Sequence, residues 1–140
     1  MRFFRPARKY EDINEAAERA LTLTDLARRA GSLAAALSHG EQRQLEIAMT
    51  LATSPRVLLL DEPLAGMGAE ESLQLRALIA KLAGDHAILL VEHDMDAVFS
   101  VALVLTVMVN GRVLESGTPE AVRRSAAVQE AYLGKEEAGL

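Results

Sequence analysis

The sequence predicts an α/β fold in which helices alternate with strands of a buried parallel sheet. Residues 57–60 and 87–91 are unbroken aliphatic runs, a pattern typical of parallel strands that are covered on both faces. Between them, residues 69–83 carry apolar side chains at helical spacing, which indicates an amphipathic helix. This alternation of elements predicts helices packed in layers on a sheet.

Composition and charge fit one globular domain. The chain has 140 residues, of which 50% are hydrophobic and 25% charged, far from a disordered composition. It has no cysteine, which excludes disulfides, thiolate metal sites and cysteine nucleophiles. A net charge of −5 with 4% aromatic residues argues against a nucleic-acid partner. The longest apolar run, residues 98–109, is shorter than the roughly 20 residues of a spanning helix, so we expect a soluble intracellular protein.

The N-terminal third of the chain is predicted to be helical. Apolar residues recur at helical spacing through the first 37 residues, and Gly31 marks the expected break between helical pieces. A further helix is predicted over residues 38–53, because Pro55 follows it and cannot continue it.

The C-terminal third is predicted to contain a β-hairpin. Residues 105–109 form a third apolar run, and residues 112–115 are the expected return strand. Asn110 and Gly111 stand between them, and both tolerate the positive φ angles that a type I′ turn requires.

Two short helices are predicted on either side of this hairpin. Asp94 can accept hydrogen bonds from the first turn of a helix that follows it. Thr118 precedes Pro119, and proline is favoured at the first position of a helix.

Two carboxylates, Asp61 and Glu62, follow the predicted strand 57–60 directly. In parallel sheets, ligands bind beyond the carboxyl ends of the strands. Asp61 could hold Mg²⁺ through water, because hard cations prefer oxygen ligands. Glu62 could polarise an attacking water molecule. A strand that ends in a polar turn without any function explains the same two residues.

The segment from Ser38 to Glu41 also has two explanations. Serine followed three residues later by glutamate forms a capping box, which explains both residues structurally. The same helix start offers free N–H groups and a positive dipole end, which suit a phosphate. Gly40 would allow a phosphate to approach the backbone closely.

His93 follows the second predicted strand and could contact the terminal phosphate of a nucleotide. It could equally be a polar residue at a strand end. Together with His39 and His86 it does not have the spacing of a zinc site, so we expect no zinc.

In order and spacing, these segments resemble the C-terminal half of the ATP-binding subunit of an ABC transporter. Ser38-His-Gly-Glu-Gln resembles the signature motif, and Leu58 to Glu62 resembles the Walker B motif. Several further segments resemble the ATPases of branched-chain amino acid importers, and urea and amide importers have similar subunits. These segments are residues 45–48, 61–67, 91–95 and 128–134.

The resemblance implies that the signature segment binds ATP held by the opposite subunit. Ser38, His39, Gly40 and Glu41 would make these contacts.

The resemblance also implies the catalytic residues. Asp61 would hold Mg²⁺ through water, Glu62 would be the catalytic glutamate, and His93 would be the switch histidine. Gly68 stands where the D-loop of the family carries an acid.

The implied fold is a partial P-loop NTPase fold in three parts. Residues 1–53 would be a helical subdomain segment that ends in the signature helix. Residues 54–117 would be the parallel-sheet core and hairpin, and residues 118–140 a C-terminal helical tail of the importer type.

The 140 residues contain no phosphate-binding loop of the form G-x-x-x-x-G-K-[ST]. We therefore expect a truncated subunit that does not bind or hydrolyse ATP appreciably by itself. The core would lack the Walker A strand, which in the family lies between the strands at 87–91 and 105–109. Its loss would leave an unpaired edge or force those strands together, and exposed edges associate.

The resemblance implies a role in ATP-driven import of branched-chain amino acids, with ATP and Mg²⁺ as cofactors in the intact family. The implied partners are a second ATP-binding subunit and integral membrane permease subunits. The implied location is cytoplasmic, peripheral to the inner face of the bacterial cytoplasmic membrane. The alternatives are a non-catalytic fragment that pairs with an intact subunit, a piece of a urea or amide importer, and a non-functional product.

Overall fold

A computed structural model describes the backbone of residues 9–136 and the side chains of residues 9–131. The chain divides into two compact units, Met1–Glu92 and His93–Leu140. The three-part division at residues 53 and 117 stays a prediction. Over residues 9–136, no helix is long and apolar enough to span a bilayer.

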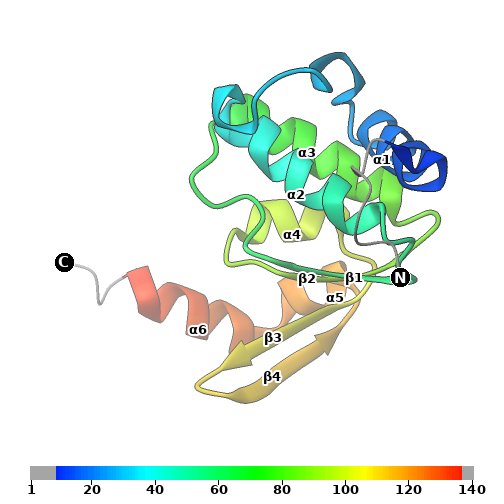
Figure 1. Cartoon of the computed structure of the whole chain (residues 1–140). Helices are drawn as coiled ribbons and strands as arrows, with labels where there is room; N and C mark the ends of the chain where they lie inside the picture. The colour runs from blue at the N-terminus through cyan, green and yellow to red at the C-terminus, as the bar shows by residue number, and fades with distance from the viewer. Residues whose placement is uncertain (1–8, 137–140) are drawn as a thin grey trace. The chain divides into compact units, whose positions relative to one another are not determined.

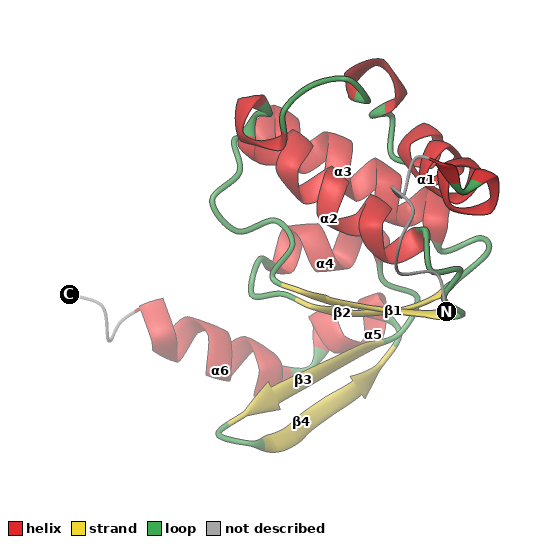
Figure 2. Ribbon diagram, in the orientation of Figure 1, coloured by secondary structure: helices red, strands yellow, loops and turns green. Residues whose placement is uncertain are grey.

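The first unit contains three α-helices and two 3₁₀ turns within its described residues (Figure 2). Helix α2 contacts both α1 and α3. The predicted helices at 38–53 and 69–83 are confirmed, with ends within two residues of the expected positions. The helical elements are α1 (Glu11–Leu23), η2 (Ala27–Arg29), η3 (Ala34–Ala36), α2 (His39–Leu51) and α3 (Ala69–Leu82).

The predicted helical content of residues 24–37 is wrong, because α1 ends at Leu23 and only 3₁₀ turns follow. Asp25 takes a left-handed φ of 60°, which an L-residue cannot continue into a right-handed helix. Its N–H donates to Thr22 O at 3.3 Å, and the N–H of Leu26 donates to Leu21 O at 2.8 Å. These two bonds form a Schellman cap with an aspartate where glycine is usual. The part of the prediction on residues 1–8 lies outside the described residues.

Strands β1 (Val57–Asp61) and β2 (Ala87–Val91) pair in parallel, as predicted. The prediction that both faces are buried is wrong. Leu58 is completely buried, whereas its neighbour Leu59 is 73% exposed. Within this unit, α2 and α3 lie on one side of the two strands (Figure 1). They therefore cover only the face of the strands that carries Leu58.

The edge of β2 stays unpaired in the described sheets. β1 and β2 form one two-stranded sheet, and β3 and β4 form another. Within the first unit, β2 is hydrogen-bonded to β1 alone, so its other edge is unpaired among the described residues of that unit.

The second unit is a β-hairpin with helices before and after it. Helix α4 (Met95–Val101) precedes the antiparallel strands β3 (Leu105–Val109) and β4 (Arg112–Gly117). Helices α5 (Pro119–Arg124) and α6 (Ala126–Glu136) follow, and both contact the hairpin.

The hairpin turn and both helix caps of this unit are confirmed. Asn110 and Gly111 have φ angles of 49° and 75°, the positive values that a type I′ turn requires. The side chain of Asp94 accepts the N–H of Ala97 at 3.1 Å. Thr118 caps α5 in the same way, with Pro119 in the first turn.

Candidate functional site

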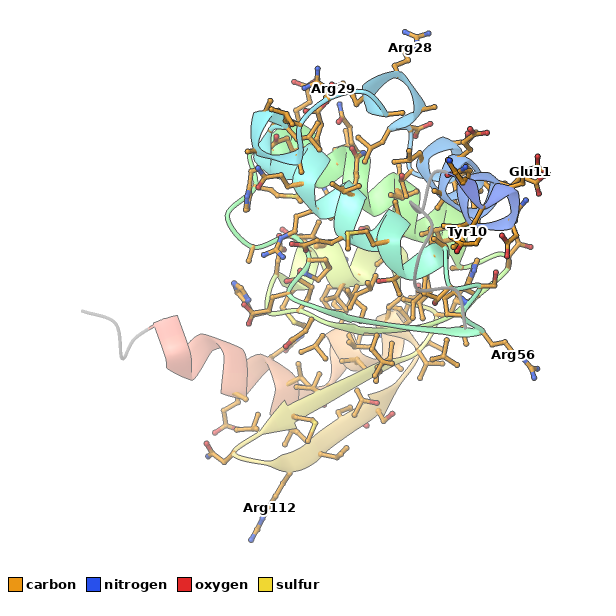
Figure 3. The ribbon with its side chains drawn as sticks, in the orientation of Figure 1. Tyr10, Glu11, Arg28, Arg29, Arg56 and Arg112 are labelled. Carbon is orange, nitrogen blue, oxygen red and sulfur yellow. The ribbon has the colours of Figure 1, made fainter. Side chains whose placement is uncertain are left out.

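The start of α2 is a complete capping box. Ser38 Oγ accepts the N–H of Glu41 at 3.2 Å, and Glu41 Oε2 accepts the N–H of Ser38 at 2.9 Å. Arg29 from η2 adds an ion pair, with its Nε 3.0 Å from Glu41 Oε1, whereas its neighbour Arg28 projects away from the ribbon (Figure 3). The structural explanation of this segment is therefore correct, and it leaves the phosphate-binding explanation open.

A carboxylate from another helix also lies at the start of α2. Glu71 of α3 accepts the N–H of Gly40 at 3.2 Å. This bond, followed by a hydrogen bond from the Ser38 side chain, lowers the pKa of Glu71. A Cβ at Gly40 would lie 2.9 Å from Glu71 Oε1, so glycine permits this close approach. Glu71 was not predicted from the sequence, because no local pattern links residue 71 to residue 40.

The same helix start contacts the loop that resembles the D-loop. His39 Nε2 lies 3.3 Å from Ala65 O. Gly66 has a left-handed φ of 74° and lies close to the His39 ring. Gly68 ends this loop as the residue before α3. The structure thus brings the signature-like segment and the D-loop-like segment together within one unit.

Asp61 and Glu62 lie at the carboxyl end of β1. Asp61 is the last residue of the strand and pairs in register with Val91. Glu62 has a left-handed φ of 43°, and its N–H donates to Val91 O at 2.8 Å. Both side chains belong to exposed residues, so a ligand can reach them.

Asp61 also borders a cavity of about 210 Å³. Its exposed carboxylate supplies the oxygen that Mg²⁺ prefers. The described side chains contain no cluster of three metal-binding groups. Mg²⁺ keeps several waters and binds through one or two carboxylates and substrate phosphates, so the residues present fit such an ion. The cavity is lined by Arg43, Glu46, Ile47, Thr50, Leu59, Leu60, Asp61 and Pro63.

His93 is the first residue of the second unit. It is exposed and directly precedes Asp94, the residue that caps α4. Its role as the switch histidine stays a prediction.

The lowered pKa of Glu71 predicts a pH-dependent contribution to stability. A carboxylate whose folded pKa lies below its unfolded value stabilises the fold above the unfolded pKa. This contribution is lost as the pH falls through the folded pKa. We therefore expect Glu71→Gln to lower the urea midpoint at pH 7 and to have less effect at pH 3.

Urea unfolding of both proteins between pH 7 and pH 3 measures this difference. Glu70→Gln is the matched control, because Glu70 is the exposed neighbour in the first turn of α3. Equal effects of the two substitutions at every pH would contradict the prediction.

Comparison with known proteins adds two family matches. Residues 5–65 match the family described as ABC transporter. Residues 112–138 match the family described as branched-chain amino acid ATP-binding cassette transporter. The first match covers the signature-like and Walker B-like segments, and the second covers β4, α5 and α6.

Individual relatives agree with these families. The chain is 45% identical over 117 residues to the high-affinity branched-chain amino acid transport ATP-binding protein BraF of Pseudomonas aeruginosa, covering 82% of this chain and 45% of that protein. It is 42% identical over 127 residues to the corresponding protein LivG of Escherichia coli K12, covering 87% of this chain and 50% of that protein. The chain thus spans about half the length of these curated relatives.

A solved structure shows the same fold. The ADP conformation of MJ1267, an ATP-binding cassette of an ABC transporter, superposes with a TM-score of 0.82 at 27% identity. The superposition covers 96% of this chain and 54% of that one. The predicted partial P-loop NTPase fold is therefore confirmed. Sequence and structure together show that the chain belongs to the ATP-binding cassette family of ABC transporters.

Proposed function

We propose that the chain supplies the signature and catalytic-carboxylate part of the ATP-hydrolysing site of a branched-chain amino acid importer. The observation that carries this proposal is the exposed pair Asp61–Glu62 at the carboxyl end of a parallel strand. The names of the relatives BraF and LivG and the family match at residues 112–138 support the choice of transported substrate.

Each catalytic candidate has a distinct role in this proposal. Asp61 would hold Mg²⁺ through water, and the ion would neutralise charge on the phosphates. Glu62 would accept a proton from the attacking water, as an ionised carboxylate can. His93 would contact the terminal phosphate through its ring.

The signature segment would act on ATP held by the opposite subunit. The hydroxyl of Ser38 and the N–H of Gly40, which donate to Glu71 in this structure, would donate instead to the terminal phosphate, helped by the positive end of α2. His39 and Glu41 would border this contact, and Gly68 would lie at the subunit interface.

A phosphate-binding loop must come from a segment outside these 140 residues. Its backbone N–H groups and lysine provide most of the binding of nucleotide phosphates in P-loop proteins. The 140-residue polypeptide by itself should therefore bind MgATP only at millimolar concentrations or not at all. Among the described residues of the first unit, β2 pairs only with β1, which supports this reasoning because a strand that carries such a loop could pair at the other edge of β2.

The partners follow from the same proposal. A second ATP-binding subunit would complete each site, and integral membrane permease subunits would couple hydrolysis to transport. The chain would then work in the cytoplasm, peripheral to the inner face of the bacterial cytoplasmic membrane, with no nucleic-acid partner.

A fusion protein tests this proposal. The part of BraF that has no counterpart in this chain would be joined covalently to the 140 residues. We expect the fusion protein to bind MgATP at micromolar concentrations and to hydrolyse it, and the 140-residue chain to do neither. Titration calorimetry and phosphate release measure the two properties.

The BraF part alone is the control for the fusion protein. A fusion protein that folds, by circular dichroism and gel filtration, and binds MgATP without hydrolysing it would contradict the catalytic proposal. That result would favour the alternative, a non-catalytic module that pairs with an intact subunit.

A further inference from the structure

The backbone of Glu62 is held in an unfavourable conformation. Its φ of 43° lies in the left-handed region, which few residues other than glycine, asparagine and aspartate adopt. The next residue is Pro63, whose ring further restricts the backbone before it. Such a conformation persists only when the surrounding structure enforces it.

Two backbone hydrogen bonds fix Glu62 itself. Its N–H donates to Val91 O at 2.8 Å, and its carbonyl oxygen accepts the N–H of Ala65 at 3.1 Å. The first bond attaches the residue to the end of β2, and the second closes a turn over residues 62–65. Neither bond reaches the middle of this turn.

The middle of the turn is held by a side chain from the end of β2. Glu92 Oε1 accepts the N–H of Leu64 at 2.9 Å. The bond joins residues that are 28 positions apart, and Leu64 is only 8% exposed. A buried N–H without an acceptor is costly, and a charged acceptor makes a strong bond. The turn therefore depends on the oxygen acceptor that Glu92 supplies.

We propose that Glu92 is a positioning residue that holds the turn 62–65, and with it the left-handed backbone from which the Glu62 side chain projects. The effect of Glu92 on the backbone follows from the hydrogen bonds of Glu62 and Leu64. Its consequence for catalysis rests on the proposed function of Glu62. Because His93 is the next residue, the same side chain also anchors the chain directly before the second catalytic candidate.

The turn should need an oxygen acceptor at position 92, and neither the charge nor the volume of that side chain should replace it. Glutamine at position 92 keeps a carbonyl oxygen that can accept the Leu64 N–H. Alanine removes it, and methionine fills a similar volume without it. We therefore expect Glu92→Gln to preserve the turn, and both Glu92→Ala and Glu92→Met to release it.

Amide hydrogen exchange of the ¹⁵N-labelled 140-residue chain tests the proposal. In Glu92→Ala and Glu92→Met, the amides of Glu62 and Leu64 should exchange about tenfold faster or more, as expected for losing a hydrogen bond to a charged group. Amides within α3 should keep their rates. Glu92→Gln should accelerate exchange several-fold less than Glu92→Ala, because it keeps a neutral acceptor for the Leu64 N–H, and Glu70→Ala is the control for an exposed glutamate.

Three results would overturn the proposal. The first is unchanged exchange at Glu62 and Leu64 in the alanine and methionine variants. The second is equal acceleration of all amides, which would mean that Glu92 stabilises the whole unit. The third is a glutamine variant that behaves like alanine. If the alanine variant does not fold, the methionine variant decides the first two.

ATP hydrolysis by the fusion protein separates this inference from the proposed function. Glu92→Ala should lower kcat with little change in KM, and Glu92→Gln should restore kcat. A parent fusion protein without turnover would refute the proposed function and leave the exchange result standing. A hydrolysing fusion protein whose kcat is unchanged by Glu92→Ala would refute the catalytic role of the positioning.

Discussion

Glu62→Gln in the fusion protein is expected to remove most ATP hydrolysis and to leave MgATP binding nearly unchanged. Glutamine has almost the size of glutamate, but it cannot accept a proton from the attacking water. General-base catalysis contributes about 10²–10⁴ to the rate, so kcat should fall by about that factor. Because Glu62 is exposed at the end of β1, the substitution should not disturb the packing of the unit.

Steady-state phosphate release and calorimetric titration of MgATP measure the two effects separately. Glu18→Gln is the matched control, since Glu18 is an exposed residue of α1 and has no proposed role. A fusion protein in which Glu62→Gln and Glu18→Gln give the same kcat would show that Glu62 is not the general base. A large loss of MgATP binding would show that Glu62 acts in binding.

Elements that depend on neighbouring residues were predicted well from the sequence. The capping box at Ser38 and Glu41 and the turn at Asn110 need only a few adjacent residues. The parallel pairing of β1 with β2 followed from two aliphatic runs separated by a helix. In each case the physical cause acts within one element or between consecutive elements, so the pattern is visible in the sequence.

Features that depend on tertiary contacts were not predicted. α1 ends because Asp25 adopts a left-handed conformation, and aspartate does so far less regularly than glycine. Glu71 and Glu92 meet backbone N–H groups 31 and 28 positions away. No spacing rule links such pairs, because the folded unit alone brings them together.

The burial of β1 shows a second limit of sequence analysis. An aliphatic run reports how apolar a strand is, and not which of its faces other elements cover. Leu58 and Leu59 are identical neighbours in the sequence, yet one is buried and the other is mostly exposed. The difference arises because side chains alternate between the two faces of a strand.

This pair of leucines provides the prediction with the largest expected effect on stability. Leu58→Ala should lower the free energy of unfolding by about 2–5 kcal/mol, because it removes a fully buried side chain and leaves a cavity. Leu59→Ala should cost less than about 1 kcal/mol, since an exposed strand position loses mainly β-propensity. Urea unfolding followed by far-UV circular dichroism measures both values.

The two variants share the strand, the residue type and the substitution. The difference between their free energies of unfolding therefore reports the burial of Leu58 on the helix-covered face. A domain is commonly stable by only about 5–15 kcal/mol, and Leu58→Ala can therefore remove much of the stability of this unit. Equal losses for the two variants would contradict the one-sided burial of β1. They would mean that another surface covers Leu59 in solution, which gel filtration of the parent chain would detect if that surface belongs to a second copy.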